Sequence, residues 1–324
     1  MAQVYMSSIR RKEPESIHGW YLDAELALLV GEERAALALY EKVFAACPDY
    51  LSDLAFRIGA LHAGQGRRAE AQRYWASPNA GAEARRWLRR FALEDSLRAH
   101  PVPFNPEPIE GLATSADEFL AVRSPDGSKW YLTRRRNVVD RKSGPAARTY
   151  LEEALCEGIP QDGSVEVRPL EHPFNAGLNE GGPSVSADDQ WMVLTVCAPD
   201  ANGYRNCDLF VAHRELGEWS TLRRLDEAST PTHWESQGAL SANGDRIIFS
   251  SDRPGGRGGL DLWITQRNPD GSWTQPVNLG PAINTDGDEK SPFLHADGRT
   301  LFFSSDGHPG MGGYDIFVCK REGK

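Results

Sequence analysis

The sequence predicts an α+β, multidomain chain of 324 residues, in which α-helical hairpins precede an all-β propeller with four blades. Two observations support this prediction. The last third of the chain repeats one passage three times, with an Asp recurring at Asp208, Asp261 and Asp315. The first hundred residues instead have apolar residues at helical spacing and few β-branched side chains.

The helical part is expected over residues 16–99, after a mobile tail at residues 1–15. Small, aromatic and helix-ending residues recur there 35 positions apart. The pairs are Gly31 and Gly66, Ala36 and Ala71, and Tyr40 and Trp75. This spacing resembles that of tetratricopeptide helix pairs, whose period is about 34 residues. A generic stack of α-hairpins is the alternative interpretation. We expect so short an array to dock on the propeller.

The β part repeats an apolar run, a Gly-rich loop and a second apolar run, which predicts a hairpin. The three hairpins are Leu194–Phe210, Ile247–Trp263 and Leu301–Phe317. Each follows a Glu and then, nine residues later, a turn residue. A fourth copy begins at Glu118, and its residues match those of the last unit at a constant offset of 171. Four units of this length predict four blades.

The passages SPFLHADGRTLFFSSDGHPGMGGYDIF and VNLGPAINTDGDE resemble the TolB-like, WD-type propeller repeat of bacterial envelope proteins that also carry an OmpA-like domain. The resemblance covers roughly residues 101–324 and implies an envelope setting. The sequence departs from that pattern in two ways. We find no OmpA-like domain after the repeats and no leader before them.

The propeller is expected over residues 100–324, with a closing strand at residues 102–109. The fourth unit reaches Lys324 without an outer strand, whereas residues 102–109 precede the first inner strand. At the offset of 171 they match an outer strand of the third unit. Proline is tolerated on an edge strand, so this segment could complete the fourth blade.

Charge and hydropathy exclude some classes of protein. A net charge of −10 and a pI of about 5.4 argue against general nucleic-acid binding. No apolar run reaches the ~18 residues of a membrane-spanning helix. The N-terminal residues also lack the apolar core of a signal peptide. We therefore expect a cytoplasmic protein if the chain is complete, and a periplasmic or envelope-associated one if a leader was removed.

Four glutamates open the innermost strand of each predicted blade. They are Glu118, Glu180, Glu235 and Glu289. Closure of the ring would bring four carboxylates to one mouth of the channel, where they could hold Ca²⁺ or Mg²⁺. The alternative is that each Glu accepts hydrogen bonds from the backbone of the adjoining blade and so holds neighbouring blades together.

Two further sets of residues belong to the hairpins. Asp208, Asp261 and Asp315 are expected to cap amides of the Gly-rich loops. Cys197 and Cys207 bracket one such loop. They are either a cross-strand disulfide in an oxidising compartment or two reduced, half-buried thiols.

No catalytic or phosphate-binding motif occurs in the sequence. We therefore expect a monomeric, non-enzymatic scaffold that binds proteins or peptides, with no cofactor beyond an ion in the channel. The alternative is a propeller-based hydrolase or lyase with an acidic channel mouth. Convergent carboxylates in an open pocket would favour an enzyme, whereas carboxylates satisfied by backbone amides would favour a scaffold.

Overall fold

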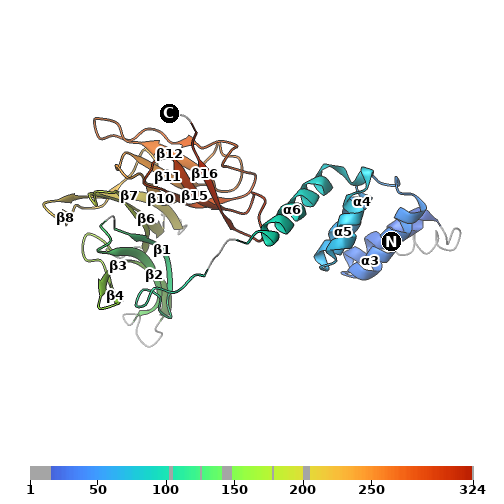
Figure 1. Ribbon diagram of the computed structural model, residues 1–324, viewed down its shortest axis with the longest axis horizontal. Coiled ribbons are helices and arrows are strands. Elements are labelled where there is room, and N and C mark those ends of the chain that lie inside the picture. Colours follow the sequence, from blue (N-terminus) through green and yellow to red (C-terminus); the bar gives the residue numbers. More distant parts are fainter. Residues whose placement is uncertain are drawn as a thin grey trace. The chain divides into compact units, whose positions relative to one another are not determined.

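The computed structural model describes residues 16–101, 105–124, 126–140, 148–176, 179–199 and 205–322. The chain divides into two compact units, Met1–Val102 and Pro103–Lys324. The first contains helices and the second contains strands, which confirms the predicted fold class (Figure 1). The expected tail at residues 1–15 lies outside the described residues. No helix in the described ranges is long and apolar enough to cross a membrane.

The described part of the first unit holds five α-helices. They are α2 (Ile17–Leu29), α3 (Glu33–Ala46), α4 (Leu54–Gly64), α5 (Arg68–Trp75) and α6 (Gly81–Ala99), with a short 3-10 helix η1 (Pro78–Ala80) before the last. Helix α2 packs on α3, and α4 packs on α5. Gly31 and Gly66, which follow the first helix of each pair, have φ of 80° and 73°. A left-handed backbone suits glycine, so both positions reverse the chain at low cost.

The 35-residue repeat is visible in the helical core. Ala36 and Ala71 are both fully buried, as small residues at a close helix–helix approach should be. Tyr40 and Trp75 are also buried and fill the space beside them. The predicted pairing of small and aromatic residues is therefore present in α3 and α5.

The second unit is a four-bladed β-propeller arrangement of antiparallel sheets. Blade 1 contains β1 (Asp117–Arg123), β2 (Trp130–Asp140), β3 (Arg148–Gln161) and β4 (Ser164–Pro169); blade 2 contains β5 (Asn179–Val185), β6 (Trp191–Pro199), β7 (Arg205–Glu215), β8 (Glu218–Trp219) and β9 (Arg223–Arg224). Blade 3 contains β10 (Glu235–Leu240), β11 (Arg246–Ser251), β12 (Asp261–Gln266) and β13 (Val277–Asn278); blade 4 contains β14 (Glu289–Leu294), β15 (Thr300–Ser305) and β16 (Asp315–Lys320).

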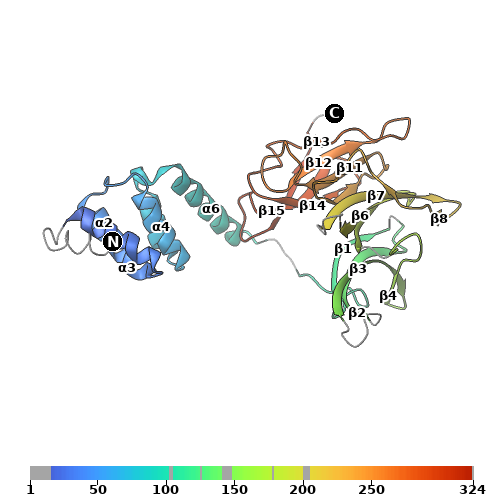
Figure 2. The same ribbon diagram turned by 180° about the vertical axis from the view of Figure 1, so that it is seen from behind.

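Neighbouring blades pack face to face through apolar side chains. Consecutive inner strands are in contact, β1 with β5, β5 with β10 and β10 with β14. Figure 2 labels β1 and β14, the inner strands of the first and fourth blades. Side chains alternate along each strand, so a middle strand serves two interfaces. In β11, Phe249 joins the core shared with blade 2, whereas its neighbour Ile248 joins the core shared with blade 4.

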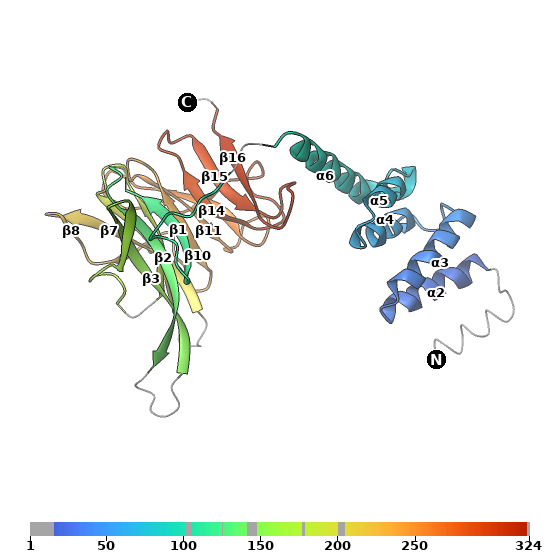
Figure 3. The ribbon, with the colours of Figure 1, turned by 60° about the horizontal axis from the view of Figure 1, so that its bottom comes forward.

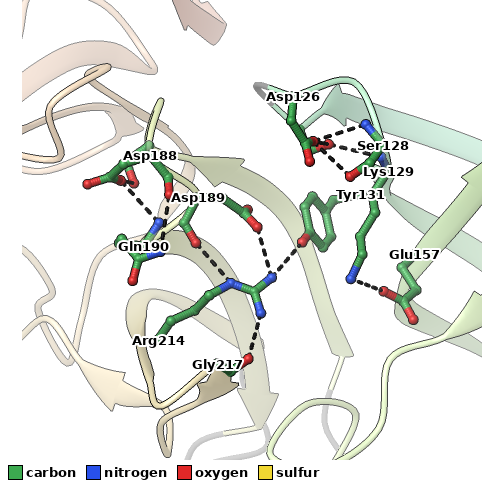
Figure 4. A network of polar contacts seen from close by, with 12 residues as sticks. Asp126, Ser128, Lys129, Tyr131, Glu157, Asp188, Asp189, Gln190, Arg214 and Gly217 are labelled. Atoms are coloured by element: carbon green, nitrogen blue, oxygen red, sulfur yellow. Dashed lines mark hydrogen bonds and ion pairs between the residues drawn. The ribbon is translucent and has the colours of Figure 1, made fainter.

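A polar network also links blades 1 and 2 (Figure 4). Arg214 of β7 donates to the backbone oxygen of Asp189 at 2.9 Å and forms a 2.9 Å ion pair with the carboxylate of Asp189. The same guanidinium donates to the hydroxyl of Tyr131 in β2 at 3.2 Å. Burial raises the pKa of Tyr131 to about 12, so this hydroxyl stays protonated at neutral pH. One arginine thus ties a turn of blade 2 to the middle of blade 1.

The predicted closing strand at residues 102–109 is not seen in its described part. Residues 105–109 belong to no strand, and the described sheet of blade 4 has three strands with β16 at its edge (Figure 3). Residues 102–104 lie outside the described residues. The following residue, Glu110, instead accepts a 3.0 Å hydrogen bond from the Val165 amide in β4. Pro106 and Pro108 have no N–H to donate to a strand ladder, which is a physical reason for the difference.

Candidate functional site

Each of the four glutamates accepts hydrogen bonds from the loop that precedes its own inner strand. Glu235 is fully buried, and its carboxylate accepts from the Thr230 amide at 2.8 Å and the Thr230 hydroxyl at 3.1 Å. It also accepts from the Ser251 hydroxyl and pairs with Arg253 at 3.0 Å. Both oxygens of this buried carboxylate are therefore used within blade 3 and its entry loop.

The other three blades repeat this arrangement with small changes. Glu289 accepts from the amide and hydroxyl of Thr285, at 2.9 and 2.7 Å. Glu118 accepts from the amide of Thr114 at 3.2 Å and pairs with Arg134 at 2.9 Å. Glu180 accepts from two backbone amides, those of Asn175 at 2.8 Å and Ala176 at 3.0 Å.

The carboxyl groups differ in acidity because their surroundings differ. Burial raises the pKa of Glu180 and of Glu235 above the usual value, since both side chains are shielded from water. Burial also acts on Glu118, but hydrogen bonds from Thr114 and the charge of Arg134 outweigh it and lower the pKa of that carboxyl.

The structure does not gather these glutamates into an ion site. No group of three or more His, Cys, Asp or Glu side chains among the described residues is arranged to hold a metal. Each carboxylate is satisfied within its own loop and blade instead. Amides and hydroxyls stabilise a buried carboxylate better than a second carboxylate would, so these contacts fit the structural interpretation of the glutamates better than the ion-binding one.

Two of the three repeated aspartates, Asp261 and Asp315, accept hydrogen bonds from amides of their Gly-rich loops. Asp261 accepts from the amides of Arg257 at 2.6 Å and Gly258 at 3.1 Å, and Asp315 accepts from those of Met311 and Gly312. Asp208 pairs with Arg224 at 2.9 Å. The loop that Asp208 was expected to cap includes residues 200–204, which lie outside the described residues.

Cys197 and Cys207 form a disulfide between β6 and β7. Of the two interpretations of this pair, the structure therefore contains the cross-strand bond. Both residues line a cavity of the propeller, which is described below. Cys47, Cys156 and Cys319 are free thiols.

A feature that we did not predict is a β-bulge in each inner strand, two residues after the glutamate. The bulge residues have positive φ: Leu120 (51°), Gly182 (60°), Gln237 (58°) and Ser291 (48°). Such backbone is strained for a residue other than glycine and persists only where surrounding contacts hold it. The sequence signal is weak, since only Gly182 among the four suggests a left-handed position.

Contacts between blades hold these bulges. The amide of Gly182 donates to the Thr133 hydroxyl of blade 1 at 2.8 Å, and the amide of Gln237 donates to the Thr195 hydroxyl of blade 2 at 3.0 Å. The amide of Ser291 donates to the Gln237 side chain of blade 3 at 2.8 Å. The bulges of blades 2, 3 and 4 therefore bind each of these blades to the preceding one. A small cavity of about 130 Å³ lies between the bulges and is lined by residues of all four inner strands.

A larger cavity of about 300 Å³ adjoins the inner one, since Leu120, Gly182 and Gln237 line both. We call it the mouth cavity. Its other lining residues are Phe119, Arg135, Glu153, Asn179, Gly181, Thr195, Cys197, Cys207, Trp234 and Ser236.

The mouth cavity is lined by aromatic side chains, one ion pair and backbone groups. Trp234 and Phe119 offer aromatic surface, and Arg135 donates to Glu153 at 2.9 Å. Glu153 is the single carboxylate among the described lining residues, and no histidine lies among them. The cavity therefore presents aromatic faces, one ion pair and backbone groups, the usual composition of a recognition site.

Comparisons with known proteins give distant structural likenesses. No protein-family model matches the chain, and no curated protein matches it. Several solved structures are similar to it at low sequence identity. A puromycin-hydrolyzing peptidase from Mycobacterium tuberculosis is 17% identical with a TM-score of 0.41, and the match covers 69% of this chain and 33% of the peptidase. The chain thus spans about a third of that peptidase.

Two other similar structures are also hydrolases. A thermostable family-43 glycoside hydrolase is 13% identical with a TM-score of 0.40, covering 62% of this chain and 69% of that one. A prolyl endopeptidase is 14% identical with a TM-score of 0.34, covering 76% of this chain and 46% of that one. Likeness at this level carries no argument about the fold or the activity of this chain.

Proposed function

We propose that this protein is a non-catalytic binding module whose propeller takes an extended peptide at the mouth cavity. The observation that supports this most directly is the cavity beside the inner strands, with Trp234, Phe119 and the Arg135–Glu153 pair on its wall. An aromatic face next to an ion pair suits a peptide that carries both an apolar and a charged side chain. The four equivalent glutamates of the blades serve the fold and not a reaction.

The helices form a second part of the proposal. Helices α2–α5 resemble tetratricopeptide pairs in the 35-residue spacing of Ala36 and Ala71. Arrays of such pairs bind partners along an extended surface. We therefore assign protein binding to the helical unit as well.

The proposed setting is an oxidising compartment such as the bacterial periplasm. The TolB-like resemblance implies the cell envelope, and the Cys197–Cys207 disulfide supports it, because such bonds are rare in reducing cytosol. Trapping of free thiols in freshly lysed host cells tests this. The proposal requires that both cysteines resist alkylation until a reductant is added, and their modification without reductant would contradict it.

Selection of peptides on the full chain tests the binding function. A random linear peptide library displayed on phage would be selected on the wild-type protein and then on Trp234→Ala. The wild type should enrich a sequence family that Trp234→Ala fails to retain, because the substitution removes the largest aromatic face of the cavity. Leu216→Ala is the matched control, since Leu216 is a fully exposed apolar residue that does not line the cavity. Failure of the wild type to enrich any family would overturn the proposal.

A further inference from the structure

The mouth cavity contains one ion pair, and its two members are not equally satisfied. Arg135 donates through Nε to the Oε1 atom of Glu153 at 2.9 Å, and its Nη2 donates to the same oxygen. The remaining nitrogen of the guanidinium, Nη1, lies 3.9 Å from the carboxylate of Asp117. The positive charge of Arg135 is therefore balanced by two carboxylates of blade 1.

Glu153 retains one carboxylate oxygen for a ligand. Both hydrogen bonds from Arg135 go to Oε1, and none of the described residues donates to Oε2. Glu153 lines the cavity, and its side chain is 25% exposed. A carboxylate oxygen that is partly shielded from water and has no protein donor is a strong acceptor for a cationic group that enters the cavity.

Trp234 offers an open aromatic face in the same cavity. No cation or aromatic ring among the described residues stacks on its indole ring, whereas the ring of Phe119 already has Arg135 at 5.2 Å. The Trp234 backbone amide donates to Asp252 at 2.8 Å, which holds this residue at the start of its blade. Tryptophan is the aromatic side chain that attracts a cation most strongly, so its ring suits the stem and charge of a basic side chain.

Two side-chain amides of the cavity have an occupied oxygen and a nitrogen without an acceptor among the described residues. Asn179 Oδ1 accepts from the Glu153 backbone amide at 3.4 Å, and Gln237 Oε1 accepts from the Ser291 amide at 2.8 Å. These backbone donors determine which end of each amide group is the oxygen, because an N–H can donate to an oxygen alone. The two NH₂ groups are therefore available to carbonyl oxygens of a bound peptide.

Size and charge both favour a basic side chain in the mouth cavity. At about 300 Å³ the cavity lies at the lower end of the range for ligand pockets, which suits one long side chain and the backbone next to it. The carboxylates of Glu153, Asp117 and Asp252 lie on its wall or against its lining residues. Arg135 alone is cationic among the described lining residues. The excess of negative charge attracts a cation and repels an acidic ligand.

We propose that the mouth cavity recognises a Lys or Arg side chain of the bound peptide. The cationic group pairs with Oε2 of Glu153, and the stem of the side chain lies along the Trp234 ring. The side chains of Asn179 and Gln237 donate to carbonyl oxygens of the peptide backbone. This inference rests on the proposed function, and it deepens that function by naming the kind of residue that the cavity recognises.

Peptide pools that differ at one position test the proposal. Each pool contains fluorescently labelled hexapeptides with blocked termini, one fixed central residue and random uncharged residues elsewhere. The fixed residue is Arg, Lys, Glu or Leu, and binding to the full chain is measured by fluorescence anisotropy. The Arg and Lys pools should bind at least about tenfold more tightly than the Glu and Leu pools, the difference expected for one charge-assisted hydrogen bond.

Three protein variants locate the acceptor. Glu153→Gln should weaken binding of the Arg pool at least about tenfold, to the level of the Leu pool, because it removes the negative charge. Glu152→Gln is the matched control and should bind as the wild type does. Glu152 is the preceding residue of β3 and pairs with Arg136 at 2.9 Å, but it does not line the cavity. Arg135→Gln should instead strengthen binding of the Arg pool, because it also frees Oε1 of Glu153.

The outcomes separate this inference from the proposed function. If no pool binds the wild type, the proposed function fails and this inference fails with it. If the Leu or Glu pool binds as tightly as the Arg pool, peptide binding stands, but recognition of a basic residue is wrong. Circular dichroism would verify that the variants fold. Unchanged binding of the Arg pool to folded Glu153→Gln, or its loss in folded Arg135→Gln, would also overturn the inference.

Discussion

At the scale of single residues, the glutamates show how one position in a repeat can serve the same purpose in different electrostatic surroundings. Glu180 has two backbone amides as partners, whereas Glu118 has the cation Arg134 beside it. Burial therefore raises the pKa of Glu180, whereas hydrogen bonds and the positive charge of Arg134 lower the pKa of Glu118. The two carboxyl groups are expected to affect stability with opposite dependence on pH.

The first prediction concerns Glu180→Gln and Glu118→Gln. Because the pKa of Glu180 is raised in the folded state, the wild type should gain stability over Glu180→Gln as pH falls toward the usual value of 4.5. Because the pKa of Glu118 is lowered, the wild type should lose stability relative to Glu118→Gln as pH falls below 4.5. Urea unfolding of the three proteins between pH 7 and pH 3 measures both slopes. Parallel curves for the two variants would contradict this assignment.

At the scale of elements, β-bulges and helix contacts position the chain. The bulge of β10 is held because Thr195 of the neighbouring blade accepts from the Gln237 amide. Helix α4 lies so close to α5 that a Cβ added at Gly59 would come within 2.3 Å of the Trp75 ring nitrogen. A hydroxyl group fixes the neighbouring strand in the first case, and the absence of a Cβ lets the neighbouring helix approach closely in the second.

The second prediction tests the bulge. Thr195→Val keeps the shape of the side chain but removes the hydroxyl, leaving the Gln237 amide without its acceptor. We expect the free energy of unfolding to fall by about 1–3 kcal/mol, the cost of an unsatisfied buried donor. Thr195→Ser retains the hydroxyl and should cost clearly less. Chemical denaturation of both variants checks this, and equal losses would show that packing, not the hydrogen bond, matters at this position.

The third prediction compares two glycines of α4. Gly59→Ala should destabilise the helical unit by about 1–3 kcal/mol, because the added methyl group collides with the Trp75 ring. Gly64→Ala meets no atom within 4 Å and should instead be neutral or stabilising by up to about 1 kcal/mol. Thermal melts followed at a helical circular-dichroism wavelength distinguish them. The same sign for both substitutions would refute the close approach.

At the scale of the whole molecule, the sequence predicted the elements that recur in every repeat. It did not predict features that depend on the backbone of a single residue. The order of helices and blades followed from the 35-residue spacing and from Asp208, Asp261 and Asp315. The bulge at Leu120 could not be read in advance, since leucine rarely takes positive φ. The offset of 171 aligned residues 102–109 with an outer strand, but the described residues 105–109 belong to no strand. A constant offset takes no account of Pro108, which has no N–H to donate to a strand ladder.

The fourth prediction is that the full chain is a monomer. Sedimentation velocity at micromolar concentrations should give one species with the mass of a single chain, 35.8 kDa. A mass that rises with concentration toward twice this value would contradict the prediction.

The most direct test of the proposed function is whether the propeller binds a peptide at its mouth and releases it unchanged. A peptide selected on the wild type would be incubated with the full chain while its binding is followed by calorimetry and its mass by mass spectrometry. We predict saturable binding that Trp234→Ala weakens at least about tenfold, with the peptide intact after prolonged incubation. Cleavage or chemical change of the peptide by the wild type would contradict a non-catalytic module. Undiminished binding to Trp234→Ala would contradict the mouth cavity as its site.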